Sequence, residues 1–157
     1  MTRVKVKDFT GMTARASINY KPVVYNLYYV TPESLGLYWD QLDFKEALSH
    51  THMTTADLKE AIQKGACDLF LAKDNNLNTY GGLVVRVFDS FGGRVLEVVC
   101  AQGKNMADWF SQLWIQVEDI AKRCQCNRIL ITGRQGWKKQ MKMFNFEQKA
   151  IVLEKVL

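Results

Sequence analysis

The 157-residue sequence lacks most of the features that mark disordered, secreted or membrane proteins. It has only two prolines and no repeat or low-complexity tract, and 48% of its residues are apolar against 24% charged, a balance typical of folded chains. Its longest apolar runs fall far short of the ~20 residues that cross a bilayer. The start, MTRVKVKDF, lacks the apolar centre of a signal peptide. We therefore expect a soluble, cytosolic protein with no membrane contact.

Metal and redox motifs are also missing. Four cysteines lie in or beside apolar segments, where a free thiol behaves as a small hydrophobe: Cys67, Cys100, Cys124 and Cys126. The spacing of Cys124 and Cys126 is not the C-x₂-C of zinc sites, and there is no second pair. His50 and His52 form an equally isolated pair. We predict reduced cysteines and no metal site.

The net charge of +5 is unevenly distributed along the chain. Residues 1–22 carry a net charge of +4, residues 23–121 carry −6 and residues 122–157 carry +7. An acidic centre between basic ends argues against a uniformly basic nucleic-acid binder, although the basic ends could still meet phosphates. We predict a basic arm over residues 1–22, either a loosely held terminus or edge strand or a contact for a partner. Residues 23–157 then form a single domain.

Hydrophobic spacing predicts the element order β-α-α-β-β-β-α-β-α-β. Strands are expected at 23–30, 67–73, 80–90, 94–101, 127–133 and 149–157, and helices at 31–50, 54–64, 105–124 and 136–144. Thr31 supplies the first helix cap, and either Thr54 or Thr55 supplies the second. Short turns join the three central strands, which should therefore form an antiparallel meander. The fold class is α+β (mixed α/β), with a central, mostly antiparallel sheet flanked by helices.

The joint between the strand at 94–101 and the helix at 105–124 contains the chain's most informative residues. A helix N-terminus exposes unpaired N–H groups and the positive end of the helix dipole, which attract phosphate. Gly103 allows the backbone to approach a ligand closely, Lys104 adds a positive charge, and Asn105 is a residue type that adopts left-handed conformations. Such a joint either cradles a diphosphate or simply connects strand to helix.

This order and this joint resemble the GNAT superfamily of acyl-CoA-dependent N-acetyltransferases, over about residues 23–157. The family motif Q/R-x-x-G-x-G/A, which receives the pyrophosphate of coenzyme A, is matched at Gln102-Gly-Lys-Asn105-Met-Ala107, with Asn105 in place of its middle glycine. The resemblance implies acetyl-CoA as the cofactor. It places Gln102, Gly103, Lys104, Asn105, Met106 and Ala107 at the pyrophosphate. It also assigns the backbone N–H groups of Val98, Val99 and Cys100 to polarise the thioester carbonyl.

A second resemblance is to small GNAT-like proteins encoded among phage and prophage virion genes. It rests on Gly133-Arg-Gln-Gly136-Trp137-Lys138, the later Asn145-Phe146, and Val152-Leu-Glu-Lys155. It implies action in a host cytoplasm or in association with a virion. Residues 1–22 would then contact virion or host proteins, whereas nucleic acid is the less favoured partner.

The catalytic residues are only partly matched. Glu97, on the strand before the motif, is the candidate base, acting directly or through water, although such a glutamate is often a solvated or core-edge residue. The family's tyrosine acid near the last helix is replaced by Phe144 and Phe146, and no tyrosine follows Tyr80. Cys100 fits an inert buried thiol better than an acyl carrier. Two hypotheses follow: an N-acetyltransferase acting on an unidentified amine, or a catalytically inactive GNAT-fold protein that acts by binding in virion assembly or host takeover.

Overall fold

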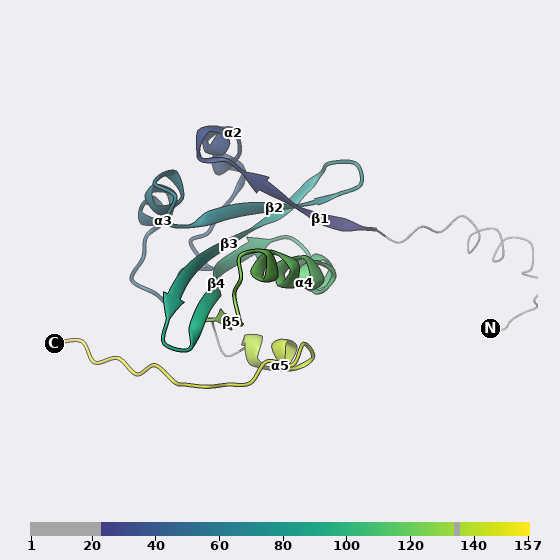
Figure 1. The fold of residues 1–157 in the computed structure, drawn as a ribbon. Helices are drawn as coiled ribbons and strands as arrows, with labels where there is room; N and C mark the ends of the chain where they lie inside the picture. The colour runs from purple at the N-terminus through teal and green to yellow at the C-terminus, as the bar shows by residue number, and fades with distance from the viewer. Residues whose placement is uncertain (1–22, 134–135) are drawn as a thin grey trace, which may run out of the picture.

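The computed structural model describes residues 23–133 and 136–157 (Figure 1). The predicted basic arm, residues 1–22, lies outside the described residues. The elements are β1 (Tyr25–Val30), η1 (Pro32–Ser34), α2 (Leu35–Tyr38), η2 (Trp39–Gln41), α3 (Thr55–Gln63), β2 (Asp68–Asp74), β3 (Thr79–Ser90), β4 (Gly93–Gly103), α4 (Met106–Arg123), β5 (Arg128–Ile131) and α5 (Gly136–Lys142).

The five strands form one sheet in chain order. Strands β1 to β4 are antiparallel in succession, which confirms the antiparallel meander predicted for β2, β3 and β4, and β5 runs parallel to β4. Parallel pairing needs a crossover, which α4 provides between β4 and β5. The predicted fold class, a mostly antiparallel sheet flanked by helices, is confirmed.

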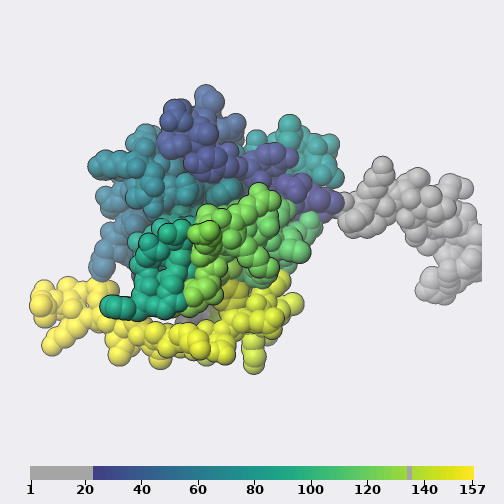
Figure 2. All heavy atoms as spheres, viewed as in Figure 1, coloured from purple at the N-terminus to yellow at the C-terminus, as the bar shows by residue number. Residues whose placement is uncertain are grey.

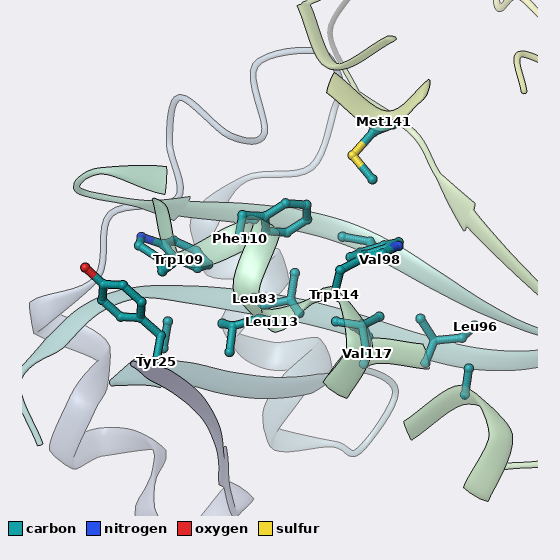
Figure 3. Packing of buried hydrophobic residues seen from close by; sticks show 14 residues of the cluster. Tyr25, Leu83, Leu96, Val98, Trp109, Phe110, Leu113, Trp114, Val117 and Met141 are labelled. Carbon is teal, nitrogen blue, oxygen red and sulfur yellow. The ribbon is translucent and has the colours of Figure 1, made fainter. Parts of the chain in front are cut away.

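Helix α4 covers one face of the sheet (Figure 3). Its buried side chains recur at helical spacing and face the strands: Trp109, Phe110, Leu113, Trp114, Val117 and Ala121. They pack against Leu83 of β3 and against Leu96 and Val98 of β4. Lys122 and Arg123 lie in the last turn, where positive charge complements the helix dipole. This amphipathic helix anchors the joint that precedes it.

The opposite face of the sheet packs against a second apolar cluster, to which α2 contributes Leu35 and α3 contributes Leu58 and Ile62. Helix α3 begins with a capping box. The Thr54 hydroxyl accepts a hydrogen bond from the Asp57 amide at 3.1 Å, and the Asp57 carboxylate accepts one from the Thr54 amide at 2.9 Å. Thr54 is thus the helix cap, which resolves the alternative that the sequence left open.

The predicted helix from Thr31 to about His50 is wrong. Short helical turns end at Gln41, and Leu42 takes an extended conformation with ψ of 143°. The Asp43 carboxylate then accepts a hydrogen bond from the Lys45 amide, a local turn that competes with helix formation. The helical spacing of apolar residues here reflects burial against the sheet, since Phe44 is 1% exposed without belonging to a helix.

The strand predicted at residues 149–157 is also absent. None of these nine residues belongs to a strand, and all of them are exposed. Their composition favours a strand, but a strand exists only where another strand supplies hydrogen-bond partners. Other elements are shorter than predicted, among them β5, which covers Arg128–Ile131, and α5, which ends at Lys142.

Candidate functional site

Strand β4 contains an irregularity at the residues expected to face an acyl group. Val84 of β3 pairs with Cys100, whereas Val85 pairs with Val98, so Val99 is an extra residue in β4. Val98 belongs to the core under α4, while Val99 and Cys100 both contact the cluster on the other face. Two successive side chains on one face mark a β-bulge, which bends the strand that contains it.

Strands β4 and β5 separate at this bulge. Their pairing ends with Val98 and Ile131, and in the described part of the chain no other strand pairs with this side of β4. The backbone groups that residues 99–101 present to this side therefore lack strand partners and can meet a ligand. A hollow of about 440 Å³ lies in the gap.

The walls of the hollow come from five segments: β4, the start of α4, the end of β5, α5 and the loop before α3. They comprise Val98, Cys100, Ala101, Met106, Ala107, Ile131, Thr132, Gly133, Gly136, Trp137, Gln140, Ala47 and His50. Four of the residues expected at the cofactor, Val98, Cys100, Met106 and Ala107, are thus brought together. Sequence reasoning missed His50, Thr132, Trp137 and Gln140 as wall residues, because nothing in their spacing relates them to β4.

The N-terminus of α4 opens beside this hollow. Asn105 is its N-cap and takes the left-handed conformation, with φ of 52° and ψ of 41°, but its side chain makes no capping hydrogen bond. The Asp108 amide donates to the Asn105 carbonyl. Among the described residues, no acceptor bonds the amides of Asn105, Met106 or Ala107. Three N–H groups and the positive helix end are therefore free to meet an anion.

The preceding half of the joint is held by the protein's own groups. The Lys104 amide donates to the Tyr80 carbonyl at 2.9 Å, and the Trp109 indole N–H donates to the Lys104 carbonyl at 2.7 Å. Gly103 has φ of +150°, and a Cβ placed on it would lie 2.3 Å from the Tyr80 carbonyl oxygen and 2.6 Å from the Gly81 Cα. The close approach that requires Gly103 is thus an internal contact between β3 and β4.

The joint consequently faces two separate hollows. A second hollow of about 350 Å³ is lined by Gln102, Gly103 and Lys104 together with Gln41, Leu42, Thr79, Tyr80 and Gly81. Met106 and Ala107 line the first hollow instead. The motif that reads as one cradle in the sequence is therefore divided by the end of β4.

This architecture matches solved acetyltransferase structures. An aminoglycoside antibiotic 6'-N-acetyltransferase from Acinetobacter baumannii aligns with a TM-score of 0.61 over 85% of this chain and 99% of its own, at 13% identity. A predicted acetyltransferase from Clostridium acetobutylicum, solved with acetyl-CoA, aligns with a TM-score of 0.59 over 85% of this chain and 96% of its own, at 11% identity. A probable acetyltransferase aligns at 0.60 over 83% and 95%, with 13% identity.

This chain has the GNAT acetyltransferase fold. No family model and no curated protein matches the chain. Residues 23–133 and 136–157 contain neither a helix able to span a membrane nor a cluster of three or more metal-ligating side chains.

In this GNAT fold Glu97 lies on β4 but does not line the first hollow. Its carboxylate accepts a hydrogen bond from Arg86 Nε at 2.5 Å and one from the Thr132 hydroxyl at 3.3 Å. The Glu97 side chain is only 15% exposed. Because Thr132 lines the hollow, Glu97 is one hydrogen bond removed from it, and a proton could reach it through Thr132 or a water.

The other residues considered for chemistry belong to the core. Phe144 and Phe146, near the last helix where the family resemblance places a tyrosine acid, pack against Trp114 with ring centroids 6.0 and 5.2 Å away. Burial, reinforced by the neighbouring Cys67, raises the pKa of Cys100 to about 12. Cys100 therefore remains a protonated thiol at neutral pH and is a poor nucleophile.

Proposed function

We propose that this protein binds acetyl-CoA between β4 and β5 and transfers the acetyl group to an amine. The observation that carries the proposal is the bulge at Val99, which opens β4 from β5 directly before the N-terminus of α4. The similarity to a GNAT-fold structure solved with acetyl-CoA supports it. Acetyl-CoA, when bound, supplies the acetyl group as an activated thioester.

The residues present fit such a ligand. The amides of Asn105, Met106 and Ala107, at the positive end of α4, offer hydrogen bonds to a diphosphate. The unpaired backbone of residues 99–101 can donate hydrogen bonds to a carbonyl oxygen that gains negative charge during transfer. Glu97 takes up the proton that the amine loses, through Thr132 or water.

A catalytically inactive GNAT-fold protein of a phage is the second candidate. Glu97 is paired with Arg86, and Phe144 and Phe146 pack against Trp114. Among the described residues, no tyrosine lines the first hollow to act as an acid. The sequence likeness to virion-gene GNAT-like proteins supports a phage origin. In this case the protein acts in the host cytoplasm or the virion, and the arm at residues 1–22 binds virion or host proteins.

Cofactor binding is tested by calorimetric titration with acetyl-CoA and the variant Ala107→Glu. Ala107 is exposed at the first turn of α4 and lines the hollow. A glutamate at this position is stabilised by the helix dipole, so the helix should be kept, but its negative charge repels a diphosphate. We expect affinity to fall by roughly tenfold or more, since like charges about 4 Å apart near a protein surface repel by about 1–4 kcal/mol. Ile115→Glu, on an exposed position of the same helix, should bind as the parent does. Absence of binding by the parent, or equal binding by Ala107→Glu, would exclude this site.

Catalysis is tested separately, by following free thiol release from acetyl-CoA in the presence of a panel of amines. Turnover that falls in Glu97→Gln while acetyl-CoA affinity is kept supports the enzyme. Binding without turnover on any amine favours the inactive protein, and a pull-down with and without residues 1–22 then tests the role of the arm.

A further inference from the structure

The first hollow is bounded by side chains from both faces of the sheet. Ala47 packs against the cluster on the α2 and α3 side, whereas Trp137 packs against the cluster on the α4 side, and both line the hollow. Trp137 of α5 meets Phe110 of α4 with ring centroids 5.1 Å apart, and Figure 2 shows α4 in green with the yellow end of the chain below it. The residues assigned to acetyl-CoA at the start of α4, Met106 and Ala107, belong to the α4 side. The α2 and α3 side of the hollow is therefore left for the amine.

The proton route of the proposed reaction also lies on the α2 and α3 side. Val98 belongs to the cluster on the α4 side, and successive side chains of a strand point to opposite faces, so Glu97 points to the α2 and α3 side. The Thr132 hydroxyl donates to Glu97 there, and Cys100 belongs to the cluster on that side. An amine that loses its proton to Glu97 therefore approaches from this side, next to Thr132.

The walls of the hollow on this side carry no negative charge. They offer a methyl group, an imidazole, a hydroxyl and a protonated thiol, which come from Ala47, His50, Thr132 and Cys100. Of all the residues in the described part of the chain that line the hollow, none is acidic. A ligand with several positive charges is selected by a surface of complementary negative charge, and these walls do not supply it.

The Glu97 carboxylate, which lies behind Thr132, is already paired with a cation. Arg86 Nε donates to it at 2.5 Å. The Arg86 side chain is 50% exposed, whereas the Glu97 side chain is only 15% exposed. A second ammonium group brought to this side would therefore meet the more exposed guanidinium, and like charges repel at close range.

An apolar surface lies beside Thr132 on β5. Ile129 and Ile131 pack on the α4 side, so Leu130 between them points to the α2 and α3 side. Leu130 pairs with Glu97 in the sheet and is 37% exposed. The body of an amine whose nitrogen lies at Thr132 can cover Leu130, which removes apolar surface from water.

We propose that the acceptor is a primary amine with an apolar body and no second positive charge, which enters from the α2 and α3 side past His50 and Thr132. Polycationic amines, such as polyamines and aminoglycosides, are then poor acceptors. The proposal rests on the proposed acetyl transfer and adds the class of substrate. In that transfer the neutral amine nitrogen forms the amide bond and the thioester C–S bond breaks. The amine proton passes to Glu97, and the coenzyme A thiolate takes a proton from water.

Two amines of equal chain length, hexylamine and hexamethylenediamine, test the charge requirement in the thiol-release assay. They differ only at one end, where the diamine carries a second ammonium group. The kcat/KM for hexylamine should exceed that for the diamine by at least about fivefold. Equal values, or a preference for the diamine, would overturn the proposal while acetyl transfer itself stands.

The variant His50→Glu should shift this preference toward the diamine. His50 is exposed and lines the hollow, so the added carboxylate lies beside the acceptor without disturbing the core. The ratio of kcat/KM for the diamine to that for hexylamine should rise by at least about fivefold. The matched control His50→Gln has the same size but no charge and should keep the ratio of the parent. An equal ratio in the two variants would overturn the proposed position of the amine.

Amine binding is also measured without turnover, by NMR of the ¹⁵N-labelled protein titrated with hexylamine in the presence of coenzyme A. The amide signals of Leu130 and Thr132 should shift. Leu130→Thr keeps the strand preference but removes apolar surface, so it should weaken hexylamine binding by at least about threefold and leave acetyl-CoA affinity unchanged. Shifts without acetylation of any amine would refute the proposed transfer and keep this binding site. An absence of shifts would overturn the present proposal, whether or not other amines are acetylated.

Discussion

Replacing Gly103 with alanine should separate an internal role of this glycine from a role in ligand binding. The sequence suggested that Gly103 is needed for close approach of a diphosphate. In the structure the added methyl group would instead lie 2.3 Å from the Tyr80 carbonyl oxygen and 2.6 Å from the Gly81 Cα. Both contacts are backbone, and neither can move without disturbing the pairing of β3 with β4.

The size of the effect follows from three contributions. Forcing a methyl group into a packed site costs about 1–3 kcal/mol, and a side chain at φ of +150° adds about 1–2 kcal/mol. Alanine restricts the unfolded chain and returns about 0.4–1 kcal/mol. We therefore expect Gly103→Ala to lower the free energy of unfolding by about 1–5 kcal/mol, or roughly 2–20 °C in Tm for a chain of this length.

Urea unfolding followed by tryptophan fluorescence measures this change, with Gly36→Ala as the control. Gly36 lies in α2, and a Cβ there meets no atom within 4 Å. Alanine should stabilise that position by up to about 1 kcal/mol because it favours helix. If Gly103→Ala is as stable as the parent but loses acetyl-CoA binding, the internal role is refuted and the sequence interpretation stands.

Three further predictions concern other parts of the fold. Gln116 of α4 accepts a hydrogen bond from the Leu27 amide of β1 at 2.9 Å. Gln116→Ala should lower the free energy of unfolding by about 1–2 kcal/mol in the same urea assay, because that amide loses its partner; an unchanged value would mean that this hydrogen bond does not stabilise β1. Desolvation raises the pKa of Asp74, but hydrogen bonds from the amides of Asn78 and Asn76 outweigh it and hold the pKa below its ordinary value. The ionised Asp74 therefore contributes stability above its unfolded-state pKa, and this contribution is lost as the pH falls through its folded-state pKa. Asp74→Asn should make Tm fall less steeply with decreasing acidic pH than it does in the parent. An equally steep fall would contradict this. Cys100 should resist a thiol reagent at pH 8 until urea is added, since burial raises its pKa to about 12. Labelling of Cys100 in the native protein, detected by mass spectrometry, would disprove its burial.

Much of the fold could be predicted because its signals are local. The apolar stripe of α4, the cap at Thr54 and the glycines of the β3–β4 turn each lie within a few residues of the structure they specify. The strand-to-helix joint was recognised for the same reason, and the left-handed Asn105 fits the residue type found there. The helix predicted from Thr31 to His50 failed because burial alone can mimic helical spacing.

The candidate site was only partly predictable. The resemblance to a family motif predicted Gln102 to Ala107 as cofactor-binding residues, but the division of this segment between two hollows follows from where β4 ends against Tyr80 and Trp109. Thr132 and His50 come from segments far from β4 in the sequence, so no spacing rule reaches them.

Local sequence signals were enough to indicate which segments prefer strand or helix, that α3 begins at Thr54 or Thr55, and that a polar joint precedes a long amphipathic helix. The tertiary structure alone decided that Val99 is a bulge, that β5 leaves β4 after Val98, and that residues 149–157 remain unpaired. The physical reason is that a residue's conformational preference is a property of its immediate neighbours. A bulge, a gap between strands or an unpaired strand is defined by hydrogen bonds to a segment elsewhere in the chain.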